Sequence, residues 1–129
     1  MNFGRIGRLR QLAAACVLGL AALPAVAQEE QAQRGVSAVL RGLDKVNGRN
    51  VDVDIPTGGS AEVFGLIVTL TECRYPVTNP TGDAFAYVTI RDPQNGEAFF
   101  DGWMIASSPA LSALDHARYD VWVIRCKSS

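Results

Sequence analysis

The stretch VDVDIPTGGSAEVFGLIVTLTEC, residues 51–73 of this 129-residue chain, decides the fold. Residues 51–55 alternate strictly between apolar and acidic side chains, and residues 66–73 place apolar side chains on one face and threonines on the other. Alternation with a period of two is typical of strands that bury one face and expose the other to water. The Pro-Thr-Gly-Gly-Ser run at residues 56–60 predicts a turn, so the stretch predicts consecutive strands joined by short connections.

Strand patterns continue on both sides of this stretch. Further strands are expected at residues 37–43, 61–64, 84–91, 98–106 and 119–126. Asn47-Gly48 predicts a type I′ hairpin turn in which both residues take positive φ, and residues 92–96 predict a second turn. Seven short strands separated by turn signals indicate an all-β domain, a small antiparallel β-sandwich or barrel. An immunoglobulin domain would carry a tryptophan soon after its first cysteine, whereas Trp103 follows Cys73 by thirty residues.

One short helix is expected near residues 109–115. Ser108 precedes Pro109, which matches a helix N-cap followed by proline at the first helical position. Leu111 and Leu114 are three residues apart and would share one face of such a helix.

The first 27 residues have the layout of a cleavable secretory signal peptide. Three arginines and no acid lie within the first ten residues, and an uncharged apolar run at residues 12–23 follows. The Ala-Val-Ala sequence ending at Ala27 is a small-x-small cleavage site, so we expect cleavage there and export to the periplasm. Cys16 lies inside the apolar run and would leave with it. The run is shorter than the roughly 20 residues that span a bilayer, so no stable membrane anchor is expected after cleavage.

The mature chain is expected to begin with a disordered leader, residues 28–36, followed by a single β domain at residues 37–127. It would carry 9 basic and 13 acidic side chains, a formal charge of −4, because three of the 12 basic residues and none of the acidic ones precede residue 28. A mildly acidic chain without a basic cluster argues against nucleic acid and anionic membranes as partners.

Two cysteines, Cys73 and Cys126, remain after cleavage and permit one intramolecular disulfide. The bridge would close a 53-residue separation, for which chain entropy gives a stabilisation on the order of 4 kcal/mol. A redox pair is disfavoured because such pairs usually have Cys-x-x-Cys spacing.

His116 is the single histidine and therefore the first candidate for catalysis. A zinc site needs three or four ligands, which His116 would have to complete with carboxylates alone, so we expect no metal or other cofactor. A serine hydrolase would use Ser107 or Ser108 as nucleophile, His116 as base, and Asp115 or Asp120 as the orienting acid. On one helix, Ser108 and His116 would lie roughly 12 Å apart along the axis, so we do not expect an enzyme of this class.

Other acidic and glycine-rich stretches have simpler interpretations than ligand binding. Asp52 and Asp54 share a strand face, but a calcium cage needs six or more oxygen ligands, so a solvated face is favoured. Residues 92–97 have turn chemistry, and residues 58–60 lack the lysine and the helix of a phosphate loop.

Two stretches, residues 99–105 and 119–124, carry large apolar side chains on both alternating faces. A strand that is apolar on both faces must be covered on both. The second cover is either residues 110–114, which would make these side chains ordinary core, or another molecule, which would make them a binding surface. The candidate interaction surface comprises Trp103, Met104, Ser107, Ser108, His116 and Trp122.

Residues 102–116, residues 119–123 and Cys126 together resemble the signature of a bacterial family called domain of unknown function 2155. Residues 40–46 resemble the opening of that family, and the resemblance covers residues 39–127. It implies an envelope protein of Gram-negative bacteria exported to the periplasm. It implies no activity and no catalytic residues.

These patterns lead us to expect a non-catalytic periplasmic module that binds another envelope protein or has a structural role in the envelope. Two alternatives stay open: a hydrolase that acts on an envelope polymer through His116, and a small-ligand carrier with an apolar cavity of several hundred Å³.

Overall fold

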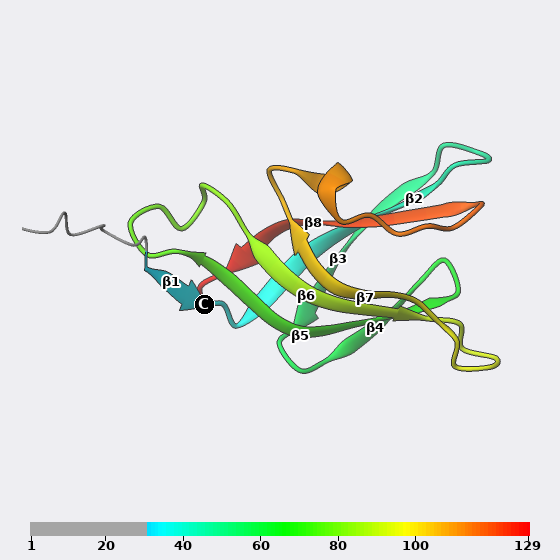
Figure 1. The fold of residues 1–129 in the computed structure, drawn as a ribbon, viewed down its shortest axis with the longest axis horizontal. Coiled ribbons are helices and arrows are strands. Elements are labelled where there is room, and N and C mark those ends of the chain that lie inside the picture. Colours follow the sequence, from blue (N-terminus) through cyan, green and yellow to red (C-terminus); the bar gives the residue numbers. More distant parts are fainter. Residues whose placement is uncertain (1–30) are drawn as a thin grey trace, which may run out of the picture.

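The computed structural model describes residues 31–129, which form eight strands and one three-residue 3-10 turn (Figure 1). The elements are β1 Ala32–Arg34, β2 Ser37–Asp44, β3 Asn50–Pro56, β4 Ser60–Val63, β5 Leu66–Pro76, β6 Phe85–Arg91, β7 Ala98–Ile105, η1 Pro109–Leu111 and β8 Tyr119–Lys127. The predicted all-β fold with one short helical segment is confirmed, with one strand more than expected. The predicted signal peptide and its cleavage site at Ala27 lie outside the described residues.

The strands form two antiparallel sheets. The five-stranded sheet has the order β1-β5-β6-β7, with β4 also paired to β5, and the three-stranded sheet has the order β3-β2-β8. Strand β2 is therefore the centre of its sheet, and its partners are the next strand in the chain and the last one.

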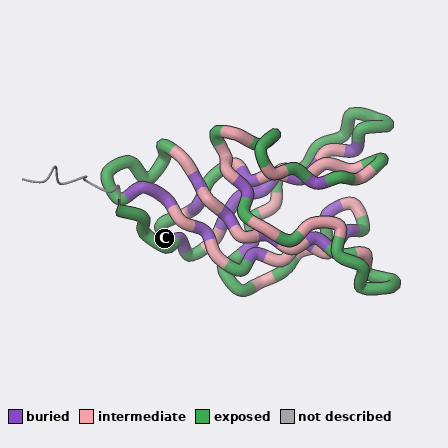
Figure 2. The backbone as a smooth tube through the Cα atoms, viewed as in Figure 1, coloured by how far each residue is buried: buried purple, intermediate pink, exposed green. Residues whose placement is uncertain are grey.

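The core lies between the inward faces of the two sheets (Figure 2). Its fully buried side chains include Leu40, Ile55, Val121 and Val123 from the three-stranded sheet and Leu70, Val88, Ile90 and Met104 from the five-stranded sheet. Because β8 alternates, Val121 and Val123 point into the core while Trp122 points to the outside. Of the apolar side chains on the two faces of residues 119–124, those on one face therefore belong to the core and those on the other face lie at the surface.

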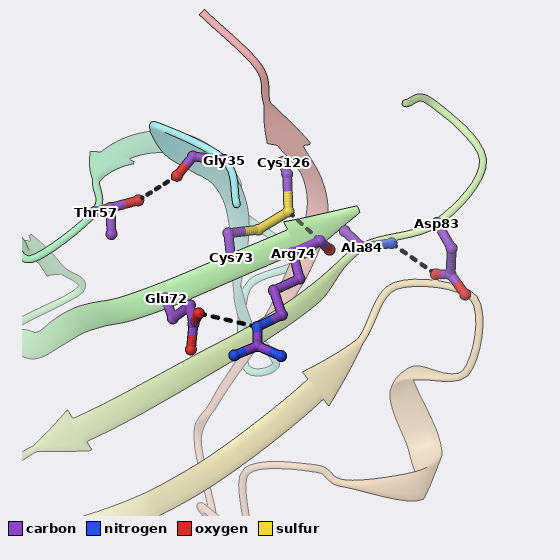
Figure 3. Close-up of a disulfide and its surroundings, with 8 residues drawn as sticks. All are labelled: Gly35, Thr57, Glu72, Cys73, Arg74, Asp83, Ala84 and Cys126. Carbon is purple, nitrogen blue, oxygen red and sulfur yellow. Dashed lines mark hydrogen bonds and ion pairs between the residues drawn. A yellow bond between two sulfur atoms is a disulfide. The ribbon is translucent and has the colours of Figure 1, made fainter. Parts of the chain in front are cut away.

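The predicted disulfide is present and joins the two sheets (Figure 3). Cys73 on β5 and Cys126 on β8 are both buried, and their Cα atoms are 5.8 Å apart. Gly35, in the link between β1 and β2, passes close to the bridge, and its N–H donates to the carbonyl oxygen of Cys73 over 2.6 Å. A Cβ atom at Gly35 would lie 3.1 Å from the Cβ atom of Cys126, so the chain crosses between the sheets there with little spare room.

Two of the hairpin loops share one design, Asp-x-x-Asn-Gly-x, at residues 44–49 and 92–97. In each loop the aspartate and asparagine side chains accept the backbone N–H two residues further on, and the glycine N–H donates to the aspartate carbonyl. Gly48 alone takes positive φ in the first loop, so the predicted type I′ turn at Asn47 is wrong. The connection is longer than two residues, and a single left-handed residue is enough to close it.

Positive φ at two successive residues occurs instead at Phe64 and Gly65, where φ is 50° and 81°. Val63 pairs with Leu66, so this is a two-residue hairpin with the φ signs of a type I′ turn. A bulky residue rarely takes positive φ, and Phe64 is the one non-glycine residue to do so in residues 31–129.

Two local expectations need correction. Residues 32–34 form strand β1 instead of belonging to a disordered leader, because their backbone pairs with the end of β5 while their side chains stay exposed. The helical segment is shorter than residues 109–115: η1 has Pro109 near its start as predicted, but the Ser108 side chain makes no capping hydrogen bond. Within the described part of the chain, no helix has the length and hydropathy needed to cross a membrane.

The disulfide should make a large contribution to stability because it links strands of different sheets. We expect the Cys73→Ser/Cys126→Ser double variant to lose on the order of 4 kcal/mol of unfolding free energy, measured by urea denaturation without reductant. Reduction of the wild-type protein should reproduce the loss and leave the double variant unchanged. An unchanged unfolding midpoint in both experiments would contradict this role.

Candidate functional site

The connection between β7 and β8, residues 106–118, crosses from one sheet to the other and is here called the crossover segment (Figure 1). Its first part is fastened by Asp83, which lies just before β6 (Figure 3). One carboxylate oxygen of Asp83 accepts from the Ser107 N–H over 3.0 Å, and the other accepts from the Ser107 hydroxyl over 2.8 Å. Ser107 is therefore engaged in holding the backbone.

The far end of the crossover segment is fastened to the loop after β2. Arg118 donates to the Asp44 carboxylate over 2.9 Å through one NH2 group and over 3.2 Å through Nε. Lys45 donates through Nζ to the carbonyl oxygen of His116 over 2.6 Å, and its N–H donates to the carbonyl oxygen of Arg118. The Asp44 side chain is 5% exposed, and the hydrogen bonds from Arg118 hold its pKa below the ordinary value.

His116 has a structural position within this arrangement. Its Nδ1 atom accepts from the backbone N–H groups of Arg118 over 3.0 Å and Tyr119 over 3.1 Å. A nitrogen that accepts carries no proton, so the neutral imidazole holds its proton on Nε2.

An aromatic stack of four rings bridges the sheets at this end of the molecule. The Phe64 and Tyr119 rings are parallel with centroids 5.5 Å apart, and the His116 ring stacks on Tyr119 with centroids 5.2 Å apart. Phe99 of β7 meets His116 edge-on at 5.0 Å. Gly42 on β2 makes room for Val63 and the Phe64 ring, since a Cβ atom there would lie 2.5 Å from the Val63 side chain and 3.3 Å from the ring.

The hydrolase arrangement considered from sequence is not assembled. Residues 108–116 do not form one helix, so the roughly 12 Å helical separation does not apply. In residues 31–129, His116 hydrogen-bonds to backbone groups, and Ser107 hydrogen-bonds to Asp83 instead of to an imidazole. Neither Asp115 nor Asp120 hydrogen-bonds to His116 in this part of the chain, so no nucleophile, base and acid are aligned.

Between its fastened ends the crossover segment leaves a hollow of about 430 Å³ against β8. The lining residues are Pro109, Ala110, Ala113, Asp120 and Trp122. Leu111, beside the hollow, is 76% exposed, whereas Leu114 is 6% exposed and belongs to the core. The two leucines therefore do not share a face as predicted, because η1 ends at Leu111 and the chain continues in an irregular conformation.

The sequence-predicted interaction surface is divided by the fold. Trp122 lines the hollow on the three-stranded sheet, whereas Trp103 lies on the outward face of the five-stranded sheet and is 40% exposed. Trp103 meets Tyr87 edge-on at 5.5 Å, and the Arg74 guanidinium lies 5.7 Å from its ring. Met104 is 1% exposed and must be removed from the surface, since it points inward from β7. Of the six candidates, Ser107, Ser108 and His116 belong to the crossover segment, and none of the three lines the hollow.

The outward face of the three-stranded sheet carries paired charges. Asp52 accepts from Arg41 over 2.7 Å, and Asp54 accepts from Lys127 over 2.6 Å. These hydrogen bonds hold the pKa values of both carboxyls below the ordinary range. Both aspartates are exposed, which agrees with the predicted solvated strand face.

Several residues of the site were missed by sequence reasoning. Asp44 and Arg118 are 74 positions apart, and no local pattern connects them. Pro109, Ala110 and Ala113 are small or apolar residues whose exposure depends on where the crossover segment lies. The repeated Asp-x-x-Asn-Gly motif was the one available signal, since it marks Asp44 as a loop-ordering residue.

Comparison with known proteins supports one relationship. The family model described as "Uncharacterized protein conserved in bacteria (DUF2155)" matches residues 38–126, which confirms the resemblance found in the sequence. No curated protein and no solved structure matches the chain.

The Asp44–Arg118 ion pair should give stability a defined pH dependence. The pKa of Asp44 is lower in the folded protein than the value of about 3.9 in an unfolded chain, so the pair stabilises above about pH 4 and the contribution is lost as the pH falls further. We expect Asp44→Asn to melt several degrees below wild type at pH 7, and the difference to shrink between pH 4 and pH 2.

Asp92→Asn is the matched control for that experiment, because Asp92 has the same loop position and makes no ion pair within residues 31–129. Its melting temperature should follow the wild-type curve at every pH. A difference between Asp44→Asn and wild type that stays constant down to pH 2 would show that the ion pair is unimportant.

The role of His116 can be separated from catalysis by two substitutions. His116→Ala leaves two backbone N–H groups without their acceptor and removes the stacking, so we expect a loss of about 2 kcal/mol in unfolding free energy. His116→Asn can place Oδ1 where Nδ1 was and should lose about half as much. Equal losses for both variants in urea denaturation at pH 8 would refute the proposed acceptor role.

Proposed function

The chain belongs to this uncharacterised bacterial family, and we propose that it is an exported, non-catalytic β domain that binds another protein of the cell envelope. The binding face is the exposed middle of the crossover segment together with Trp122. A single observation carries the proposal: the hollow of about 430 Å³ between this segment and β8.

The hollow is supported on both sides by fixed structure. Ser107 is tied to Asp83 at one end, and Arg118 is tied to Asp44 at the other. Apolar residues between two fastened ends lose little conformational freedom when a partner covers them, which favours binding. Leu111 is a large apolar side chain that is exposed next to a lining residue of the hollow. An exposed apolar side chain beside a concave surface is typical of a protein contact rather than of a solvated loop.

Export is supported by the disulfide and by the composition of the first 27 residues. A buried disulfide between two sheets persists in oxidising compartments and is rare where thiols are kept reduced. Positive residues, an apolar run and a small-residue cleavage site precede the β domain. The periplasm satisfies both requirements.

The binding face can be tested by crosslinking in the periplasm of the native host. A photo-crosslinking amino acid in place of Leu111 should yield a discrete adduct with a partner protein. Trp122→Ala should reduce the adduct at least fivefold while the unfolding free energy changes by less than about 1 kcal/mol, because the indole lies outside the core.

Trp103→Ala is the matched control, since it removes a tryptophan from the outward face of the other sheet. It should leave the Leu111 adduct unchanged, and a crosslinker in place of Glu62 on β4 should give no such adduct. Adducts that persist in Trp122→Ala, or that form equally at both crosslinker positions, would overturn the proposal.

A further inference from the structure

The hollow beside Trp122 combines apolar walls with one ionisable group. Pro109, Ala110, Ala113 and the indole of Trp122 are its apolar lining, and Asp120 on β8 is the one charged residue of the lining. Its volume of about 430 Å³ is within the range of sites that hold a small molecule.

Three cations on segments next to the lining already have partners. Arg41, directly opposite Trp122 on β2, is bound to Asp52. Arg118 is bound to Asp44, and Lys45 is bound to a carbonyl oxygen. Asp120 takes part in none of the five ion pairs of residues 31–129.

A carboxylate that has no ion-pair partner restricts which side chains of another molecule can cover the hollow. An apolar side chain would remove water from Asp120 without giving it a partner, and such desolvation is costly. A side chain with an aliphatic stem and a cationic head can contact the apolar lining and the carboxylate together. An indole in the same lining adds an attraction for the cation.

We propose that the hollow binds an arginine side chain of the partner protein, with its stem against Pro109, Ala110 and Ala113 and its guanidinium on Asp120. Arginine fits better than lysine because a guanidinium can give a carboxylate two parallel hydrogen bonds and can stack on an indole. This inference rests on the proposed function and specifies the chemistry of its partner.

The test uses two probes, Nα-acetyl-arginine methylamide and its citrulline analogue, which has nearly the same shape and no charge. Titration is followed by NMR through the methyl groups of Ala110 and Ala113 and the indole N–H of Trp122. The arginine probe should produce saturable shifts at these three residues, at least fivefold tighter than the citrulline probe. Added salt should weaken the binding of the arginine probe and leave the binding of the citrulline probe unchanged.

Asp120→Asn should lower the affinity for the arginine probe to that for citrulline. Asp115→Asn is the matched control, because it removes an exposed carboxylate of the crossover segment that does not line the hollow, and affinity should stay within twofold. Equal affinities for the two probes, or no shifts at the three residues, would overturn the inference.

These results are distinguishable from failure of the proposed function. If the arginine probe does not bind while the Leu111 adduct still depends on Trp122, the arginine inference is wrong and the binding face stands. If the probe binds as expected and the adduct is independent of Trp122, the protein-binding proposal fails and the hollow is a site for a small cationic ligand.

Discussion

The covalent bond between Cys73 and Cys126 is the constraint on which this sandwich depends. It joins β5 of one sheet to β8 of the other at the end where the chain itself crosses at Gly35. A domain of this size buries a modest core, and each sheet presents only a few large inward side chains. Fixing the distance between the sheets at one end allows the remaining contacts to be made at the other.

At that other end, the sheets are joined by side chains instead of by a covalent bond. The aromatic stack from Phe64 through Tyr119 and His116 to Phe99 connects the β4–β5 turn, β8 and β7, and the Asp44–Arg118 pair fixes the adjoining loop. The unusual positive φ of Phe64 is understandable here, because the turn must aim its ring at Tyr119. The same contacts fix the position of the crossover segment and therefore the shape of the hollow.

The sequence was a good guide to what depends on local pattern. Alternation located the strands, and the two cysteines of the β domain predicted the disulfide, because period-two burial and a single possible pairing are local or countable properties. The sequence pattern could not predict that Trp103 and Trp122 lie on different faces of the molecule. Both residues follow the same alternation, and they are on different faces because their strands belong to different sheets. It also missed the Asp44–Arg118 pair and the place of Asp120 in the lining of the hollow, which depend on contacts between distant segments.

The strand order β3-β2-β8 has a consequence for how the protein is made. Strand β2 pairs on one edge with β3, the next strand in the chain, and on the other edge with β8, the last strand, so its second edge has no partner until β8 is in place. Pairing between strands so far apart in sequence is slow, and an open apolar edge is a site for aggregation. Until β8 is in place the chain therefore holds a sheet with one unpaired edge, and a chaperone that shields β2 would increase the yield of folded protein.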